Sequence, residues 1–359
     1  MADPLLFRPI RLRDLEIRNR LWVAPMCQYS VTERDGIPRD WHLQHIGGLA
    51  RGGAGLVVVE ATAVVPEGRI SPQDLGIWGD EHVPAFARLA KVAHAHGALI
   101  GIQLAHAGRK ASTHPSLPGA GTGSVAPDDG GWQTVAPSAI PFPGLATPRA
   151  LETAEILQLI EDFRAAARRA VAAGFDVLEV HAAHGYLLHE FLSPLSNLRE
   201  DEWGGPLAGR ARLVREIVRA LRADHPDTPI AVRISASEWV EGGFEAAEAR
   251  ELADWLAADG ADLIDVSSGG NIADAPIPVG PSYQVPLAAQ LRGPLPVGAV
   301  GLITSAPQAE GILATGQADV VSLGRPLLAN PHLPIAWAHE LRATDAAALV
   351  PPQYARARF

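Results

Sequence analysis

Eight short segments of almost continuous apolar residues recur along the chain, at intervals that leave room for a helix between them. They are Leu21–Cys27, Gly55–Thr62, Ala98–Ala105, Phe175–His181, Pro229–Ser235, Ala261–Ser268, Leu295–Gly301 and Ala318–Gly324. Continuous apolar runs of this length are typical of parallel strands that are covered on both faces. We therefore predict eight buried parallel strands.

Segments with helical spacing lie between these strands, and several of them end in a glycine. The clearest are Glu81–His96, Thr153–Ala173, Leu207–Asp224, Ala246–Asp259 and Ala306–Thr315, and the glycines before the next strand are Gly97, Gly174, Gly260 and Gly316. A glycine in this place is a common signal for the end of a helix. The alternation predicts an α/β fold, a (β/α)8 TIM barrel. A doubly wound sheet is the alternative, but it usually has fewer strands and a glycine-rich first turn, which APMCQYS after the first strand does not provide.

The alternation is interrupted once, after the third predicted strand. Residues 105–150 are rich in Pro, Gly, Ser and Thr and show little periodicity. A long loop within a compact domain is usually functional or disordered, and this one leaves the strand end at which barrel active sites form. We interpret residues 105–150 as a capping insertion, a lid or wall over the site, with a surface insertion of no function as the alternative. We predict one barrel domain over residues 1–359, in which residues 351–359 form a short tail.

Composition and charge narrow the class of protein. Hydrophobic residues make up 47% of the 359 residues, so a large core can form, and the net charge of −10 makes binding to nucleic acid or an anionic membrane unfavourable. Cys27 is the only cysteine, which excludes disulfides within the chain and multi-cysteine metal sites. The N-terminal segment has no apolar core of the signal-peptide type, and no apolar run is long enough to span a bilayer. We expect a soluble cytoplasmic protein.

The carboxyl ends of the predicted strands carry a set of polar and small residues, and barrel enzymes place their chemistry at these ends. The set is Ala24, Pro25, Met26, Cys27, Ala61, Gln103, His181, Arg233, Ser267, Ser268, Gly301, Gly324 and Arg325. Gly301 and Gly324 end the seventh and eighth strands, where barrels often bind phosphate through backbone N–H groups, and Arg325 adds a positive charge. Tight turns and a surface ion pair would explain the same residues without a ligand.

The segment HAAHGY, from His181 to Tyr186, concentrates candidate chemistry at the end of the fourth strand. Its two imidazoles can donate hydrogen bonds to a substrate carbonyl, and the Tyr186 phenol can act as a general acid. A metal site is a second interpretation, but it needs a third protein ligand. Ordinary packing is a third. His42 and His45 repeat the spacing in a predicted helix, where we expect the pair to be incidental and on the surface.

Arg233 and Cys27 are candidates for tuning a cofactor. If Arg233 points into the barrel, it needs a partner or an anionic ligand, and Glu179 on the neighbouring strand is a possible counter-charge. Beside a flavin, this cation would stabilise the anionic reduced form; a purely structural Glu179–Arg233 pair is the alternative. Cys27 would be a buried small hydrophobe or, if it faces the site, a weak thiol donor.

These residues together resemble the Old Yellow Enzyme family of FMN-dependent ene-reductases, in its thermophilic-like branch with the bacterial xenobiotic reductases. The resemblance runs from Leu6 to Tyr354 and rests on NRLWVAPMCQYS, QLAHAGRKA, FDVLEVHAAHGYLLHEFLSPLSNLREDEWGG, AVRIS, AVGLITS and SLGRPLLANP. It implies a barrel that binds FMN non-covalently at the strand ends. The positions that match flavin contacts are Ala24, Pro25, Met26, Cys27, Ala61, Gln103 and Arg233, with Cys27 tuning the redox potential, and those that match the phosphate end are Gly301, Gly324 and Arg325.

The same resemblance implies roles in substrate binding. His181 and His184 match the pair that holds the substrate carbonyl oxygen, Tyr186 matches the proton donor, and Tyr29 matches a tyrosine of the substrate pocket. A C-terminal arginine of this branch enters the site of a neighbouring subunit. The candidates are Arg356 and Arg358, because the tail continues beyond QYAR and lacks the usual terminal tryptophan. A homodimer or homotetramer is therefore expected.

The implied activity is a ping-pong reduction of activated C=C bonds in enones, enals, maleimides and nitroalkenes, with NADPH as a more probable hydride donor than NADH. Two other functions stay open on the residues alone. A tRNA-dihydrouridine synthase is also an FMN barrel, but the net charge of −10 does not favour RNA binding. A metal-dependent barrel hydrolase would use His181 and His184 as ligands.

Overall fold

The computed structural model describes residues 3–357, and within them eight parallel strands close into a barrel. In chain order the strands are β3 (Leu21–Val23), β4 (Leu56–Ala63), β5 (Leu99–Ala105), β8 (Val177–Ala182), β9 (Ile230–Ser235), β10 (Leu263–Ser267), β11 (Val297–Ala299) and β12 (Val320–Leu323). Each strand pairs with its neighbours in sequence, and β12 pairs with β3 to close the ring. The predicted (β/α)8 barrel is confirmed, with all eight strands where the apolar runs lie.

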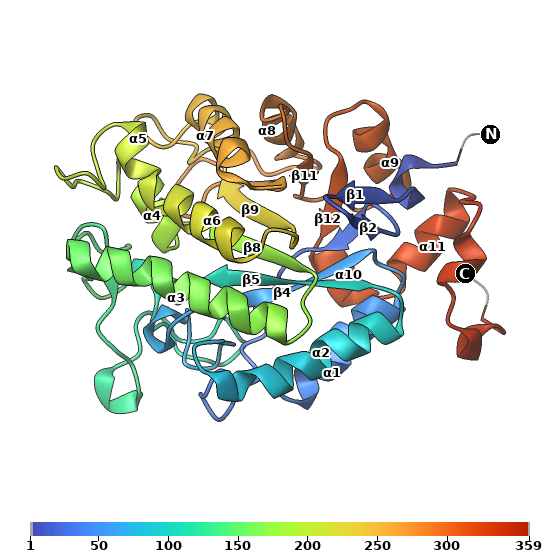
Figure 1. The fold of residues 1–359 in the computed structure, drawn as a ribbon, viewed down its shortest axis with the longest axis horizontal. Coiled ribbons are helices and arrows are strands. Elements are labelled where there is room, and N and C mark those ends of the chain that lie inside the picture. The colour runs from blue at the N-terminus through green and yellow to red at the C-terminus, as the bar shows by residue number, and fades with distance from the viewer. Residues whose placement is uncertain (1–2, 358–359) are drawn as a thin grey trace.

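Helices cover the outside of the barrel (Figure 1). The longer ones are α1 (Asp40–Arg51), α2 (Val83–Ala95), α3 (Thr153–Ala172), α6 (Arg212–Asp224), α7 (Ala246–Asp259), α9 (Ala306–Ala314) and α11 (Leu333–Glu340); α4 (Leu187–Leu192), α5 (Leu207–Arg210), α8 (Val285–Gln290) and α10 (Arg325–Ala329) are short. The predicted helix Leu207–Asp224 is divided at Ala211 into α5 and α6. All four predicted C-terminal glycines have positive φ, such as +106° at Gly260, a conformation that other residues adopt only with strain.

The hydrophobic core has two parts. The larger part lies between the strands and the surrounding helices and includes Phe86, Phe163 and Phe244, all fully buried. The smaller part fills the amino-terminal end of the barrel interior and consists of Leu12, Ile17, Trp22, Leu56, Val58, Val177, Ala231, Leu263 and Val320. The polar strand-end residues therefore lie above an apolar layer.

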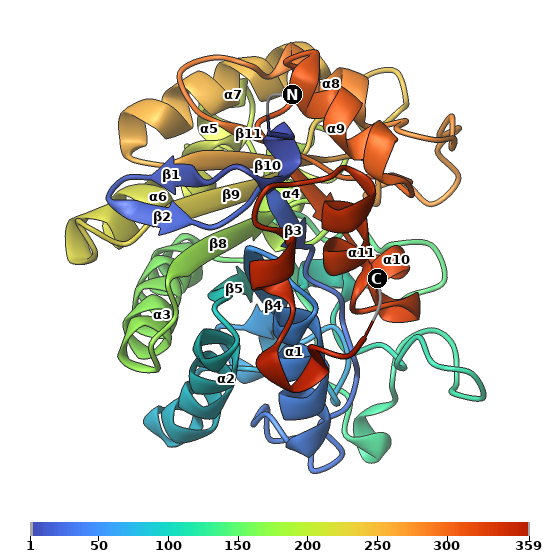
Figure 2. The same ribbon diagram turned by 90° about the vertical axis from the view of Figure 1, so that its right-hand side faces the viewer.

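An antiparallel hairpin contributes to that smaller core. Its strands are β1 (Ile10–Leu12) and β2 (Leu15–Ile17), drawn in dark blue in Figure 2. Leu12 and Ile17 pack in the same cluster as Trp22 of β3. The hairpin thus closes the amino-terminal end of the barrel, and the carboxyl ends of the strands remain for a site.

The segment after β5 contains little regular structure, as its composition indicates. Two-residue strands β6 (Val135–Ala136) and β7 (Arg149–Ala150) pair with each other near its end. A single turn of helix, Gly108–Lys110, lies at its beginning. Among residues 3–357, no helix combines the length and the apolar character needed to cross a membrane.

Candidate functional site

Strands β8, β9 and β10 bring together two predicted side chains, His181 and Arg233, and one that was not predicted, Asp265. His181 on β8 pairs in register with Arg233 on β9, and Arg233 pairs in register with Asp265 on β10. All three are almost completely buried. The alternation of the strands places Val177 and Ala231 in the apolar interior below them, as expected for inward-facing positions.

His181, His184 and Tyr186 form one cluster at the end of β8. The ring of His181 lies 5.2 Å from that of His184 and 5.1 Å from that of Tyr186, both edge to face. The turn that gathers them is unusual: His184 has a φ of +62° and Gly185 a φ of +71°. A Cβ at Gly185 would lie 2.3 Å from the carbonyl oxygen of Gly270, so only glycine fits there.

Burial sets the protonation of this cluster. The pKa of His181 and that of His184 are well below their usual value, first because both rings are buried and second because Arg233 is near. Burial also raises the pKa of the Tyr186 phenol. At neutral pH both imidazoles are therefore uncharged and Tyr186 keeps its proton.

The free hydrogen-bonding groups of the cluster suit a polar ligand. The Nε2 atom of His184 lies 2.7 Å from the hydroxyl oxygen of Ser267, which orients that ring. The Nδ1 atom of His181 is buried without a hydrogen-bond partner. A buried imidazole nitrogen without a partner costs free energy, so it is suited to a group that enters from outside the protein.

Lys110 braces this cluster from the beginning of the insertion. Its ammonium donates hydrogen bonds to the carbonyl oxygens of His184 (2.8 Å) and Gly270 (2.9 Å) and lies 5.0 Å from the centre of the Tyr186 ring. Burial lowers the pKa of Lys110 to about 8. The contact holds the turn after β8 against the loop after β10.

The ion pair of Arg233 differs from the one that the sequence suggested. The Nε atom of Arg233 lies 3.1 Å from Oδ2 of Asp265, whereas Glu179 accepts a hydrogen bond from the amide of Gln103 at 2.7 Å. The direct ion pair of Arg233 is with Asp265, which is in register with it, whereas Glu179 is near enough only for the charge of Arg233 to lower its pKa against the effect of burial. Burial raises the pKa of Glu179 to about 8, and the nearby Asp265 adds to the rise.

A second group of ionisable side chains follows β3 and β4. The thiol of Cys27 has a raised pKa, because of burial and then because of Asp74 and Glu60. Oε2 of Glu60 accepts a hydrogen bond from the N–H of Gln28 at 2.7 Å. His42 lies 3.5 Å from Oε1 of Glu60 and is buried, so the expectation of a surface position for it is wrong.

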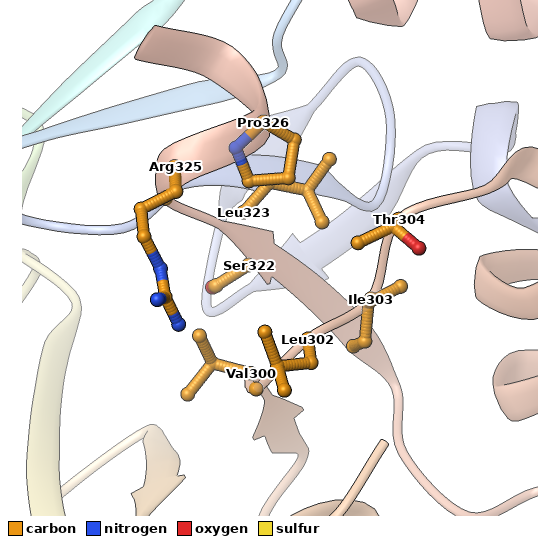
Figure 3. Close-up of a pocket in the computed structure, with 10 residues that line it drawn as sticks. Val300, Leu302, Ile303, Thr304, Ser322, Leu323, Arg325 and Pro326 are labelled. Atoms are coloured by element: carbon orange, nitrogen blue, oxygen red, sulfur yellow. The ribbon is translucent and has the colours of Figure 1, made fainter. Parts of the chain in front are cut away.

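The structure also shows a cavity of about 400 Å³ at the ends of β11 and β12 (Figure 3). It is lined by Val300, Gly301, Leu302, Ile303, Thr304, Ser322, Leu323, Gly324, Arg325 and Pro326. Gly301 has a φ of +118°, and a Cβ at Gly324 would lie 3.4 Å from the sulfur of Met26. The side chain of Arg325 extends along one side of the cavity. Glycine backbone with one arginine fits the phosphate end of a nucleotide.

The other predicted cofactor residues lie in or directly after the strands β3, β4 and β5. The N–H of Ala24 donates to the carbonyl oxygen of Leu323, which joins the loop after β3 to β12, and the strand ends at Val23, so that Pro25, Met26 and Cys27 lie in the loop. Ala61 in β4 and Gln103 in β5 are paired in register. Tyr29 has a φ of +50° and a raised phenol pKa, because of burial and then because of Cys27.

The tail places Arg356 away from these residues in its own chain. Arg356 is exposed, and the nearby Tyr354 packs against the guanidinium of Arg51, 5.6 Å from the ring centre, at the end of α1. That end of α1 leads into the start of β4, opposite the strand ends that carry the site. The predicted reach of Arg356 into a neighbouring subunit stays a prediction, and Arg358 lies outside the described residues.

Four residues of the site area were not assigned from the sequence: Lys110, Asp74, Asp265 and Thr304. Asp265 is an acid inside an apolar strand, ADLIDVSS, which is a usable signal. Lys110 and Asp74 lie in connections without periodicity, where no pattern marks them. Among residues 3–357, no group of three or more His, Cys, Asp and Glu side chains is arranged to hold a metal ion.

Comparison with known proteins gives a consistent result over nearly the whole chain. Residues 5–343 match the family described as NADH:flavin oxidoreductase / NADH oxidase. An NADPH dehydrogenase of Listeria innocua is 47% identical over 355 residues, 98% of either chain. One from Halalkalibacterium halodurans is 46% identical over 354 residues, again 98% of either chain.

Solved structures agree with the sequence relatives. An Old Yellow Enzyme homologue from Zymomonas mobilis superposes with a TM-score of 0.79 at 31% identity, over 94% of this chain and 93% of that one. Morphinone reductase in complex with tetrahydroNAD gives a TM-score of 0.77 at 31% identity, over 94% and 92% of the two chains.

Proposed function

The chain belongs to the NADH:flavin oxidoreductase / NADH oxidase family, and from that premise we propose that it is an FMN-dependent ene-reductase. It takes a hydride from NADPH and reduces the activated C=C bond of α,β-unsaturated carbonyl compounds. The dehydrogenase relatives and the structural likeness to an Old Yellow Enzyme homologue support the flavin chemistry. The substrate class rests on the site itself.

One observation carries the proposal: two uncharged imidazoles and one protonated phenol are gathered in a single turn. The rings of His184 and Tyr186 both lie within 5.2 Å of the ring of His181. Neutral N–H donors suit a carbonyl oxygen that becomes more negative during reaction, since they strengthen their hydrogen bonds as charge develops. A neighbouring phenol suits the delivery of one proton to carbon.

We place the flavin at the strand ends, and the cavity at β11 and β12 with the polar residues beside it supports this position. Backbone N–H groups at Gly301 and Gly324 and the guanidinium of Arg325 would hold the phosphate. Gln103 and Arg233 would contact the ring system, because both are buried and point to the barrel interior above its apolar layer. When bound, the flavin supplies the hydride transfer from the nicotinamide to the β-carbon of the substrate.

The protein's own residues do the remaining work. His181, whose Nδ1 atom has no partner in the protein, would donate one hydrogen bond to the carbonyl oxygen, and His184, oriented by Ser267, would donate a second. Their hydrogen bonds draw electrons toward the oxygen and make the β-carbon more electrophilic. Tyr186 then gives the proton of its hydroxyl to the α-carbon.

A stopped-flow experiment on the holoenzyme tests the proposal. Flavin absorbance is followed first with NADPH and with NADH, and then, after reduction, with an enone, a maleimide and a nitroalkene. We expect faster bleaching by NADPH and reoxidation by the enone. Tyr186→Phe should slow reoxidation by the enone about a hundredfold, and leave flavin reduction within about twofold. An enone that fails to reoxidise the flavin contradicts the proposal, and equal loss in both half-reactions makes Tyr186 structural.

A further inference from the structure

A small cavity lies between Tyr186 and a buried carboxylate that the mechanism above does not use. Its volume is about 10 Å³, and Tyr186, Asp74 and Arg69 line it together with alanine and glycine residues of the neighbouring segments. A cavity of roughly this volume is the smallest that holds a single water molecule. Water is retained in such a space only where polar groups face it.

Asp74 provides such a group. Only 1% of its surface is exposed, and its Oδ2 atom accepts a hydrogen bond from the N–H of Ser71 at 2.9 Å. The Oδ1 atom is buried and has no partner with good hydrogen-bond geometry, although the backbone N–H of Ile70, which also lines the cavity, is near enough to lower the pKa of Asp74. A buried carboxylate oxygen without a donor is unfavourable, so a water molecule in the cavity would satisfy it.

Arg69 does not neutralise this carboxylate by direct contact. Its guanidinium lies between the rings of Trp78 and Trp132, at 5.1 and 5.0 Å from their centres. Its N–H groups donate to main-chain carbonyl oxygens, including that of Pro66 at 2.8 Å. The positive charge is near enough to lower the pKa of Asp74, but burial outweighs it and raises that pKa to about 7.

The remaining ionisable groups near the cavity also have raised pKa values, so they stay protonated to a higher pH than usual. Glu60 has a pKa raised by burial, and Cys27 and Tyr29 have pKa values raised by burial and by the neighbouring acids. Tyr186 itself has a pKa raised by burial, and the charges of Cys27, Tyr29 and Asp74 add to the rise. A phenolate at Tyr186 would therefore be costly in this surrounding, because a second negative charge would develop beside buried acids.

We propose that Asp74 supplies a proton to Tyr186 through one water molecule in this cavity while Tyr186 protonates the substrate. The inference rests on the proposed function, since it needs Tyr186 to give up its proton. The Tyr186 O–H bond breaks as the α-carbon C–H bond forms; the water gives one proton to the phenol oxygen and takes one from the Asp74 carboxyl. No electrons are exchanged with these groups. Asp74 regains its proton from solvent after the product leaves.

Asp74→Asn is the direct test, because the amide keeps the size of the side chain and cannot release the proton. In stopped-flow reoxidation of the reduced holoenzyme by an enone, we expect a rate constant at least about tenfold lower, with flavin reduction by NADPH within about twofold. The wild-type rate constant should fall as the pH rises through about 7, where Asp74 loses its proton, and that of the variant should not.

Two further variants separate a proton relay from damage to the loop. Ala63→Val leaves Asp74 in place but fills the cavity that Ala63 lines, so it should slow reoxidation as Asp74→Asn does. Glu67→Gln, which removes an exposed acid from the same connection, should behave as wild type. Crystal structures of the holoenzymes give a readout apart from activity: a water between Tyr186 and Asp74 in the wild type, and none in Ala63→Val.

The outcomes distinguish this inference from the proposed function. If Tyr186→Phe slows reoxidation but Asp74→Asn and Ala63→Val do not, the relay is wrong and the proton donor stands. If Tyr186→Phe has no effect, the proposed function fails first. A proton inventory in mixtures of H2O and D2O adds a check: the three protons that move in the relay give a curved plot for the wild type, and one gives a straight plot for Asp74→Asn. A straight wild-type plot overturns the relay.

Discussion

Burial acts in opposite directions on the pKa values of two groups of ionisable side chains. His181 of the first group packs against Tyr186, and Cys27 and Asp74 of the second are near enough to raise the pKa of Tyr186. The histidine wall consists of His181, His184 and Arg233, and burial lowers the pKa of both imidazoles. The acid wall consists of Cys27, Glu60 and Asp74, and burial raises the pKa of all three. One physical cause, the loss of water, leaves the first wall with fewer protons and the second with more.

The difference shows how a site can hold neutral donors and proton-bearing acids at one pH. In the histidine wall, Arg233 adds to the effect of burial because like charges repel, so its neighbours stay neutral. In the acid wall, Asp74 and Glu60 add to the effect of burial on Cys27 in the same way, and Asp74 adds to the effect of burial on Glu60. The first wall is thus suited to polarise a carbonyl, and the second to supply protons.

Removing one member of each wall should have unequal effects on the half-reaction with enone. His181→Ala removes a donor aimed at the developing oxyanion, and we expect reoxidation to slow about a hundredfold or more. Cys27→Ser keeps a small neutral donor in the acid wall and should change reoxidation by less than about tenfold. Rate constants from stopped-flow reoxidation, at saturating enone, give the comparison. Equal losses would mean that the walls do not divide the work.

The positive charge of Arg233 in the histidine wall can be removed alone or together with its ion-pair partner, Asp265. Arg233→Met leaves Asp265 buried and unpaired, and we expect a loss of about 3–5 kcal/mol in the free energy of unfolding, with weaker retention of FMN. The double variant Arg233→Met, Asp265→Asn should recover most of the stability but not the flavin. Denaturant unfolding and the flavin absorbance of purified protein measure the two effects. Unchanged flavin retention and redox potential in Arg233→Met would make the pair purely structural.

The dependence of stability on pH should have opposite signs in the two walls. The folded pKa of both imidazoles lies below the usual 6.5, so their burial costs stability as the pH falls below about 6.5. The folded pKa of Asp74 is about 7 against a usual 3.8, so the folded state gains stability from this group as the pH falls from about 7 toward 3.8.

Asp74→Asn isolates the contribution of the acid wall to the pH dependence of stability, and the change in stability is the smallest effect that we expect. At pH 8 the wild type holds a buried ionised carboxylate and the variant does not, so the variant should melt about 3 °C higher, and this difference should shrink steadily as the pH falls from about 7 toward 3.8. Melting curves at several pH values, at fixed ionic strength, measure this. A difference in Tm that does not vary with pH would show that Asp74 is not the titrating group.

The fold could be predicted because each strand is a continuous apolar run and several helices end in a glycine. The position of His181 and Arg233 at strand ends followed from the same pattern. The ion-pair partner of Arg233 could not be predicted. The choice between Glu179 and Asp265 depends on the stagger of neighbouring strands, and the order of side chains along one strand does not reveal that stagger. Roles in catalysis came from the resemblance and stay predictions.

Most of the acid wall could not be predicted from the sequence. Cys27 was singled out, but Asp74 lies in a connection whose shape is set by contacts with distant residues, and Glu60 lies in a strand where one acid does not reveal which face it takes. Lys110 likewise gains its role from the carbonyl oxygens of His184 and Gly270, far away in the chain. The roles of loop residues of this kind can be recognised only when the three-dimensional positions of the loops are known.

The hairpin that closes the amino-terminal end of the barrel limits the direction from which reactants can enter and leave the site. Leu12 and Ile17 pack against Trp22 and close that end, so reactants can reach the strand ends only from the carboxyl side of the barrel. Under the proposed function, we therefore expect the nicotinamide and the enone to bind in turn over the same face of the flavin. At high concentration the nicotinamide and the enone should compete for this position, and each should form a non-productive complex with the wrong state of the flavin. Turnover should therefore pass through a maximum as the concentration of either reactant is raised.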